Sequence, residues 1–160
     1  MTIVILGGTA EARQLAAALV GAGIDVVSTL AGRVKNPQLP VGRVRTGGFG
    51  GVDGLADFLR AQRASAVVDA THPFAAMISR NAVQAAGLNG TALIRLERPG
   101  WGEHPRAGSW TWVPDTAAAR AAADSACRPF LTTGRQSLPD FGSWADREVL
   151  VRLVDPPTTP

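Results

Sequence analysis

The sequence has no tyrosine, one cysteine, one lysine and two histidines in 160 residues. A lone cysteine, Cys127, cannot form a disulfide within the chain, so no oxidising compartment is required. We therefore expect a cytoplasmic protein in which Cys127 is a small buried side chain. His72 and His104 lie far from each other and from Cys127 in the sequence. These side chains cannot make the usual zinc sites, and we predict no metal centre.

Long apolar runs and a concentration of charge of one sign are also missing. Glu11 and Arg13 interrupt the first apolar stretch long before the roughly 18 residues of a membrane span, and no basic segment precedes it. We expect neither a membrane span nor a signal peptide. The 16 basic and 13 acidic residues leave a net charge of +3 and are interspersed along the chain. Because nucleic-acid binding needs a clustered basic face, we expect no DNA or RNA partner.

The sequence does contain a regular alternation of short β-branched runs and helical patterns. Hydrophobic residues make up 46% of the chain, enough for a buried core. The pattern predicts strands at residues 2–6, 25–30, 43–46, 64–71 and 91–96, and helices at 10–20, 52–62 and 74–86. Repeated βα units of this length favour an α/β fold over residues 1–100, a Rossmann-like open parallel sheet with helices on both faces.

The composition changes near residues 99–108, where glycine and proline become frequent. Over residues 101–160 we expect a linker and the start of a second α/β unit that is incomplete. The pattern predicts strands at 109–113, 129–133 and 148–154, and an Ala-rich helix that Asp115 caps and that continues to Ala126. Trp110 and Trp112 are expected to pack in a core or an interface.

The turn after the first strand is typical of a phosphate-binding turn. Gly7 and Gly8 end the strand and Thr9 opens the helix, where a doubly wound sheet holds a nucleotide diphosphate on backbone N–H groups and the positive end of the helix dipole. The complete G-x-G-x-x-G pattern is absent, because Thr9 and Ala12 stand in place of its second and third glycines. The Thr9 hydroxyl is either a phosphate ligand or a helix N-cap. The negative charge of Glu11 is compatible with a bound phosphate only if this side chain points away from the phosphate.

The segments after the next two strands indicate which nucleotide would bind. No acid follows the second strand to accept the ribose 2′-hydroxyl of NAD. Arg33 follows it instead, and its guanidinium suits the 2′-phosphate of NADP, the alternative being a solvent-exposed surface arginine. After the third strand, Gly48 and three other glycines flank Phe49. They would let the backbone approach a ligand with Phe49 against a ring, or they form a surface loop.

Asp69 to Phe74 follow the fourth strand at the same edge of the predicted sheet. His72 is a candidate for proton handling, because an unperturbed histidine titrates near neutrality. Asp69 is expected to be a buried acceptor for backbone N–H groups. In the second unit, Arg135 follows a strand and a glycine and could reach an anionic substrate. No G-x-S-x-G motif supports a hydrolase, whereas a reduction needs only a positioned hydride donor and a proton source.

Together these motifs resemble the precorrin-6A reductase family of cobalamin biosynthesis, which includes the cobalt-precorrin-6A reductases. The matching segments occur in family order, at residues 5–13, 30–33, 47–51, 69–75, 95–99 and 132–136. The resemblance implies an oxidoreductase that acts on a CH–CH bond with NADP as its cofactor. Hydride from NADPH would reduce one double bond of a carboxylate-rich tetrapyrrole, precorrin-6A or its cobalt form, to give precorrin-6B.

The residues and the resemblance together predict a site. The expected contacts to NADPH are Gly7, Gly8, Thr9, Ala10, Arg33, Gly48, Phe49 and Thr71. The expected contacts to the tetrapyrrole are His72, Phe74, Arg98 and Arg135, with His72 as the catalytic residue.

Family members are similar to a pair of Rossmann-like domains around the substrate, and this chain stops where the second has barely begun. It is therefore either a fragment or a chain with a degenerate second domain, and catalysis by these 160 residues is in question. The alternative function is a module that binds NADP(H) without catalysis. A short-chain reductase or epimerase is disfavoured, because those enzymes use a Tyr–Lys pair and the chain has no tyrosine.

Overall fold

The computed structural model describes residues 1–32 and 37–153, and the predicted nucleotide ligand Arg33 lies outside these described residues. Two compact units make up the chain, residues 1–98 and 99–160. Among the described residues, no helix combines the length and the apolar character that crossing a membrane requires.

The first unit contains a sheet of five parallel strands. They are β1 (Thr2–Leu6), β2 (Asp25–Leu30), β3 (Arg43–Thr46), β4 (Ala64–Asp69) and β5 (Ala92–Arg95), in the spatial order β3-β2-β1-β4-β5. The strand order reverses between β1 and β4, and such a switch point leaves a crevice at the carboxyl ends of the two strands. The predicted parallel α/β sheet is confirmed.

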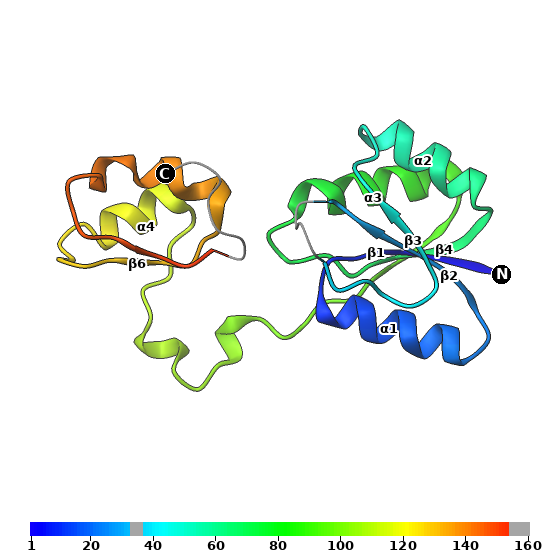
Figure 1. Ribbon diagram of the computed structural model, residues 1–160, viewed down its shortest axis with the longest axis horizontal. Coiled ribbons are helices and arrows are strands. Elements are labelled where there is room, and N and C mark those ends of the chain that lie inside the picture. Colours follow the sequence, from blue (N-terminus) through cyan, green and yellow to red (C-terminus); the bar gives the residue numbers. More distant parts are fainter. Residues whose placement is uncertain (33–36, 154–160) are drawn as a thin grey trace. The chain divides into compact units, whose positions relative to one another are not determined.

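Helices cover both faces of this sheet, as the sequence predicts. α1 (Ala10–Gly21) lies on one face, and α2 (Val52–Ala61) and α3 (Ala76–Asn89) lie on the other (Figure 1). The predicted third helix begins two residues later than expected, because residues 74 and 75 belong to the turn that precedes it.

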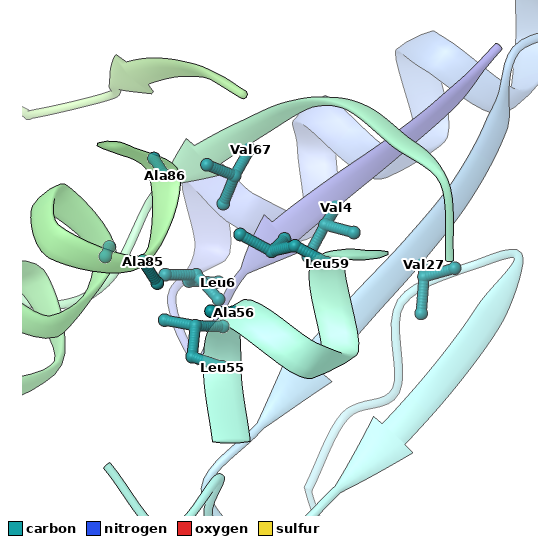
Figure 2. Close-up of a cluster of buried hydrophobic side chains, with 10 residues drawn as sticks. Val4, Leu6, Val27, Leu55, Ala56, Leu59, Val67, Ala85 and Ala86 are labelled. Atoms are coloured by element: carbon teal, nitrogen blue, oxygen red, sulfur yellow. The ribbon is translucent and has the colours of Figure 1, made fainter. Parts of the chain in front are cut away.

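The core of the first unit forms on both sides of β1. On the side of α2 and α3, alternate residues of the strands meet apolar side chains of both helices, as Figure 2 shows for Val4, Leu6, Val27, Leu55, Ala56, Leu59, Val67, Ala85 and Ala86. On the side of α1, Ile3 and Ile5 pack with Ala12 and Ala16. Small residues at these helix positions let the helices approach the sheet closely, which holds the turns at the carboxyl edge in place.

The second unit is smaller and has little regular structure. It contains α4 (Thr116–Ala122), the short parallel strands β6 (Phe130–Leu131) and β7 (Leu150–Val151), and the 3₁₀ helices η1 (Trp101–Glu103), η2 (Ala107–Ser109) and η3 (Arg135–Trp144). Leu131, Phe141 and Trp144 form its core. Trp144 is 1% exposed, and its Nε1 donates to the Asp124 carboxylate at 2.9 Å.

Several predictions for the second unit are wrong in detail. The strand expected at 109–113 is absent, because Ser109 ends η2 and residues 110–113 pair with no strand. The alternating tryptophans that suggested it are surface residues: Trp112 is 60% exposed, with its Nε1 bonded to the Ala107 carbonyl, and Trp110 stacks on His104 with ring centroids 4.9 Å apart. Neither is a core residue.

The remaining differences concern the lengths of one helix and two strands and the exposure of Cys127. Asp115 caps α4 as predicted, by accepting from the Ala118 amide at 2.8 Å, but the helix ends at Ala122 and not at Ala126. The predicted strands at 129–133 and 148–154 shorten to the two-residue β6 and β7, and residue 154 of the second prediction lies outside the described residues. Cys127 is exposed and not buried.

Candidate functional site

Two turns meet at the carboxyl edge of the first unit's sheet, one between β1 and α1 and one between β4 and α3. They are neighbours because β1 and β4 keep one register from Ile3 and Ala66 to their carboxyl ends, where Leu6 lies opposite Asp69. The Ala70 amide continues this pairing by donating to the Leu6 carbonyl at 3.0 Å. The candidate nucleotide-binding turn and the candidate catalytic histidine therefore lie side by side.

Two glycines shape the β1–α1 turn in different ways. The Gly7 amide donates to the Thr29 carbonyl at 2.9 Å, and a Cβ on Gly7 would lie 3.3 Å from the same oxygen. Gly7 therefore allows close packing between β1 and β2. Gly8 has a φ of +113°, a conformation that side chains disfavour, and no atom would lie within 4 Å of a Cβ there. The space beside Gly8 is open to a ligand.

The first turn of α1 offers a set of free donors. Within the described part of the chain, the N–H groups of Gly8, Thr9 and Ala10 donate to no other group. They point out of the helix N-terminus, where the peptide dipoles add a partial positive charge. This donor set and the open space beside Gly8 fit an anionic diphosphate.

The Thr9 side chain takes the second of the two roles that the sequence left open. Its Oγ1 accepts from the Ala12 amide at 3.1 Å, which makes Thr9 the N-cap of α1, and it donates to the Ala70 carbonyl at 2.7 Å. The side chain is buried, and because its hydroxyl proton is donated to Ala70 it is not available to a ligand. Only the backbone amide of Thr9 remains for a ligand.

Glu11 and Arg98 form an ion pair next to this turn, with Arg98 Nε 3.7 Å from Glu11 Oε1. The pKa of Glu11 is lowered, first by a hydrogen bond from its own backbone amide and then by the charges of Arg98 and Arg13, which together outweigh the opposite effect of burial. Glu11 is therefore ionised at neutral pH. Arg98, the predicted substrate ligand, lies beside the α1 N-terminus, where it offsets that negative charge.

A buried carboxylate organises the β4–α3 turn. Asp69 is 3% exposed, and its Oδ1 accepts from the Thr71 amide at 3.1 Å and from the Thr71 hydroxyl at 2.6 Å. Its Oδ2 accepts from Arg95, which also donates to the Ser79 hydroxyl. Asp69 is the buried acceptor that the sequence predicted, and Thr71, a predicted nucleotide contact, has its hydroxyl and amide directed inward.

The balance of these contacts sets the charge of Asp69. Burial by itself would raise the pKa of this carboxyl. Hydrogen bonds from Thr71 and Ser79, together with the Arg95 charge, outweigh that effect and hold the pKa below its ordinary value. Asp69 is therefore an anion that fixes the backbone on the N-terminal side of His72.

His72 projects from this turn into solvent. Its Nδ1 accepts from the Phe74 amide at 3.2 Å, so the neutral ring carries its proton on Nε2, the nitrogen left to face a ligand. The imidazole lies 5.0 Å from the ring of Phe74, which is 84% exposed. The Ala75 amide closes the turn by donating to the His72 carbonyl at 2.8 Å. An exposed imidazole on a fixed turn can exchange a proton with a bound molecule.

The glycine-rich loop after β3 holds Phe49 inward. The Phe49 ring lies 5.2 Å from the ring of Phe58, and the Arg45 guanidinium lies 4.3 Å above it. Arg45 also donates to the carbonyls of Gly47 and Gly48, at 2.7 and 2.9 Å. One face of Phe49 is thus covered by Arg45, and contact of this ring with a nucleotide stays a prediction.

Some of the predicted site residues lie together in the first unit. Thr9, Thr71 and Arg98 line one small pocket, together with Glu11 and Ala70. Arg135 is the first residue of η3 in the second unit. Among residues 1–32 and 37–153, no group of three or more His, Cys, Asp and Glu side chains could hold a metal ion.

Sequence reasoning missed the partners of Asp69 and Phe49. Arg95 lies directly opposite Asp69 in the β4–β5 pairing, a position that the strand order would have revealed. Arg45 is the penultimate residue of β3, two and three residues before the glycines whose carbonyls it binds, and nothing in the local pattern distinguishes it from a surface arginine.

Comparison with known proteins gives consistent similarities. The family described as "Precorrin-6x reductase CbiJ/CobK" matches residues 2–160. A precorrin-6A reductase of Rhodococcus erythropolis is 53% identical over 158 residues, which cover 97% of this chain and 63% of that protein. One of Rhodobacter capsulatus is 48% identical over 160 residues, which cover 99% of this chain and 63% of that protein.

A solved structure described as "CobK precorrin-6A reductase" has a similar fold. Its TM-score to this chain is 0.92 with 46% identity, over 100% of this chain and 64% of that one. The chain thus spans about 63% of the length of the curated relatives that it matches.

Proposed function

Because the chain belongs to the precorrin-6x reductase family, we propose that it takes part in the NADPH-dependent reduction of precorrin-6A to precorrin-6B, with its first unit as the nucleotide-binding part. The observation that carries this proposal is the juxtaposition of the two turns. Free amides at the α1 N-terminus lie beside the turn that bears the exposed His72. A nucleotide held at the first turn would have its reactive end within reach of the second.

In this proposal the backbone of residues 8–10 holds the diphosphate, and Gly8 keeps the space beside it open. Arg33 binds the 2′-phosphate, which makes the site specific for NADP(H) over NAD(H). Gly48, Phe49 and Thr71 are further contacts to the nucleotide. When bound, NADPH supplies a hydride to one carbon of a substrate double bond, and the neighbouring carbon takes a proton.

The remaining predicted residues act on the substrate. His72 handles the proton through Nε2, because its Nδ1 is bonded to the Phe74 amide. Phe74 offers an exposed ring to the tetrapyrrole. Arg98 and Arg135 bind substrate carboxylates, since a guanidinium pairs well with a carboxylate.

Gly8→Ala tests the nucleotide site directly. The added Cβ strains a residue whose φ is +113° and fills the space beside the amides. We expect calorimetry to show NADPH affinity at least about tenfold lower than in the wild-type chain. Gly23→Ala is the matched control, because Gly23 also has a positive φ and open surroundings but lies at the other end of α1. Equal affinity in the two variants would contradict the proposal.

A module that binds NADP(H) without catalysis is the second candidate. It is favoured by the location of the free amides and the glycine-rich loop, which all belong to the first unit. Oxidation of NADPH that depends on added tetrapyrrole supports the reductase. Tight nucleotide binding with no such oxidation supports the module.

A further inference from the structure

Thr9 makes the one side-chain hydrogen bond between the two candidate turns among the described residues. Its hydroxyl donates to the Ala70 carbonyl across 61 positions of sequence, at 2.7 Å, and both groups are buried. Ala70 directly precedes Thr71 and His72. The helix cap of α1 and the carbonyl that begins the histidine turn therefore share one hydroxyl.

The other hydrogen bonds that hold the histidine turn come from within the turn itself or from the sheet. Asp69 holds Thr71 from within the same segment, and the Ala75 amide closes the turn on the His72 carbonyl. The Ala70 amide is part of the sheet. Of the described hydrogen bonds, only that of Thr9 connects this turn to residues 8–10.

Resting on the proposed function, we propose that Thr9 is a positioning residue whose hydroxyl connects the diphosphate-binding turn to the histidine turn, so that anion binding at residues 8–10 orients His72. Thr9 does this through bonds on one residue: its N–H faces the ligand, and its Oγ1 accepts from Ala12 and donates to Ala70. A shift of the Thr9 backbone toward a bound anion therefore moves the Thr9 hydroxyl, and with it the Ala70 carbonyl to which that hydroxyl donates. A merely structural cap would bind Ala12 and leave the second turn unaffected.

The two histidines of the chain make this coupling measurable. The probe is 2′-phospho-ADP-ribose, which has the diphosphate and the 2′-phosphate of NADP but no nicotinamide ring to touch His72. Its effect on the imidazole resonances is followed by nuclear magnetic resonance at fixed pH. In the wild-type chain we expect the His72 signals to shift on binding, with His104 of the second unit as the internal reference.

Variants of Thr9 separate the hydroxyl from the amide. Thr9→Ser keeps the hydroxyl and should keep the His72 shift. Thr9→Val keeps the shape and the backbone amide, so the probe should bind within about tenfold of the wild-type affinity while most of the His72 shift is lost. Thr9→Ala gives the same test with a smaller side chain if Thr9→Val folds poorly. Glu11→Gln, which breaks the ion pair of the same helical turn with Arg98, should keep the shift.

The outcomes distinguish this inference from the proposed function. If the wild-type chain does not bind the probe, the proposed nucleotide site is wrong and the inference falls with it. If the probe binds and the His72 shift is as large in Thr9→Val and Thr9→Ala as in the wild-type chain, only the role of Thr9 is overturned. Loss of the shift in both variants with its recovery in Thr9→Ser supports the role.

Discussion

The carbonyl oxygen of Phe49 lies against Gly54, so close that a Cβ on Gly54 would be 1.8 Å from it. Gly54 lies in the first turn of α2, and the glycine-rich loop crosses that turn directly. No other described glycine leaves so little room for a side chain. The approach fixes the loop against the helix and directs the Phe49 ring toward Phe58.

Gly54→Ala is therefore expected to destabilise the first unit, although alanine favours helices. The added carbon meets backbone, which cannot move as a flexible side chain would, and we expect a loss of about 1–3 kcal/mol in the free energy of unfolding. Urea unfolding followed by far-ultraviolet circular dichroism measures it. Gly87→Ala in α3 is the control: nothing lies within 4 Å of its Cβ position, so it should stabilise by about 0.5–1 kcal/mol. A neutral Gly54→Ala would contradict the observed packing.

The lowered pKa of Asp69 predicts a pH-dependent contribution to stability. A carboxyl that is more acidic in the folded state than in the unfolded state stabilises above its unfolded pKa, near 3.8, and this contribution is lost as the pH falls through the folded value. Asp69→Asn removes the charge, so we expect it to cost about 1.5–3 kcal/mol at neutral pH. The difference from the wild-type chain should shrink in acid.

Denaturant titrations from neutral to acidic pH test this expectation. Asp57→Asn serves as the control, because Asp57 pairs with Arg60 at the exposed surface of α2 and should contribute little at any pH. A constant difference between Asp69→Asn and the wild-type chain across the acidic range would show that the Asp69 charge does not stabilise the fold.

Arg33→Ala tests the nucleotide selectivity. A charge-assisted contact to the 2′-phosphate is worth about 1.5–3 kcal/mol, so we expect NADPH affinity to fall roughly ten- to a hundredfold while NADH affinity stays unchanged. Arg33→Lys keeps the charge without the planar guanidinium, so its NADPH affinity should lie between those of Arg33→Ala and the wild-type chain. Calorimetry with both nucleotides gives the comparison, and equal losses for NADPH and NADH would remove the 2′-phosphate assignment.

His72→Ala is expected to lower turnover and leave nucleotide affinity nearly intact. Positioned acid–base groups contribute about a hundredfold or more to a rate, and the exposed His72 makes no hydrogen bond with the amides of residues 8–10. Tetrapyrrole-dependent oxidation of NADPH measures the first quantity and calorimetry the second. His104→Ala, the other histidine variant, should change neither. An unchanged rate in His72→Ala would make His72 a structural residue.

Patterns of short range predicted the first unit well. The apolar run of β1 and the glycines that follow it identify a strand, a turn and a helix within one segment, and Asp69 was identified as a buried acceptor by its place at a strand end. The Thr9 hydroxyl left two roles open, because a cap and a phosphate ligand require the same residue at the same position. Only the place of Ala70, which depends on pairing between β1 and β4, decides between them.

The second unit shows where such patterns fail. Alternating tryptophans predict a half-buried strand, yet Trp110 stacks on His104 at the surface, and a local pattern does not distinguish these two surroundings. The buried tryptophan, Trp144, lies at the end of a ten-residue 3₁₀ helix, an element with no clear periodic signature. Trp144 packs with Phe141 of the same helix and with Leu131 of β6, and the contact with Leu131 depends on the fold of the unit and not on a local pattern.

All four tryptophans lie in the second unit, and the chain has no tyrosine, so the first unit contains phenylalanine as its only aromatic residue apart from His72. Intrinsic tryptophan emission therefore records residues 99–160 alone. Melting of the sheet that bears the candidate site makes no direct contribution to that signal. Energy transfer from the tryptophans to a reduced nicotinamide bound at the first unit would, in turn, report the distance between the two units.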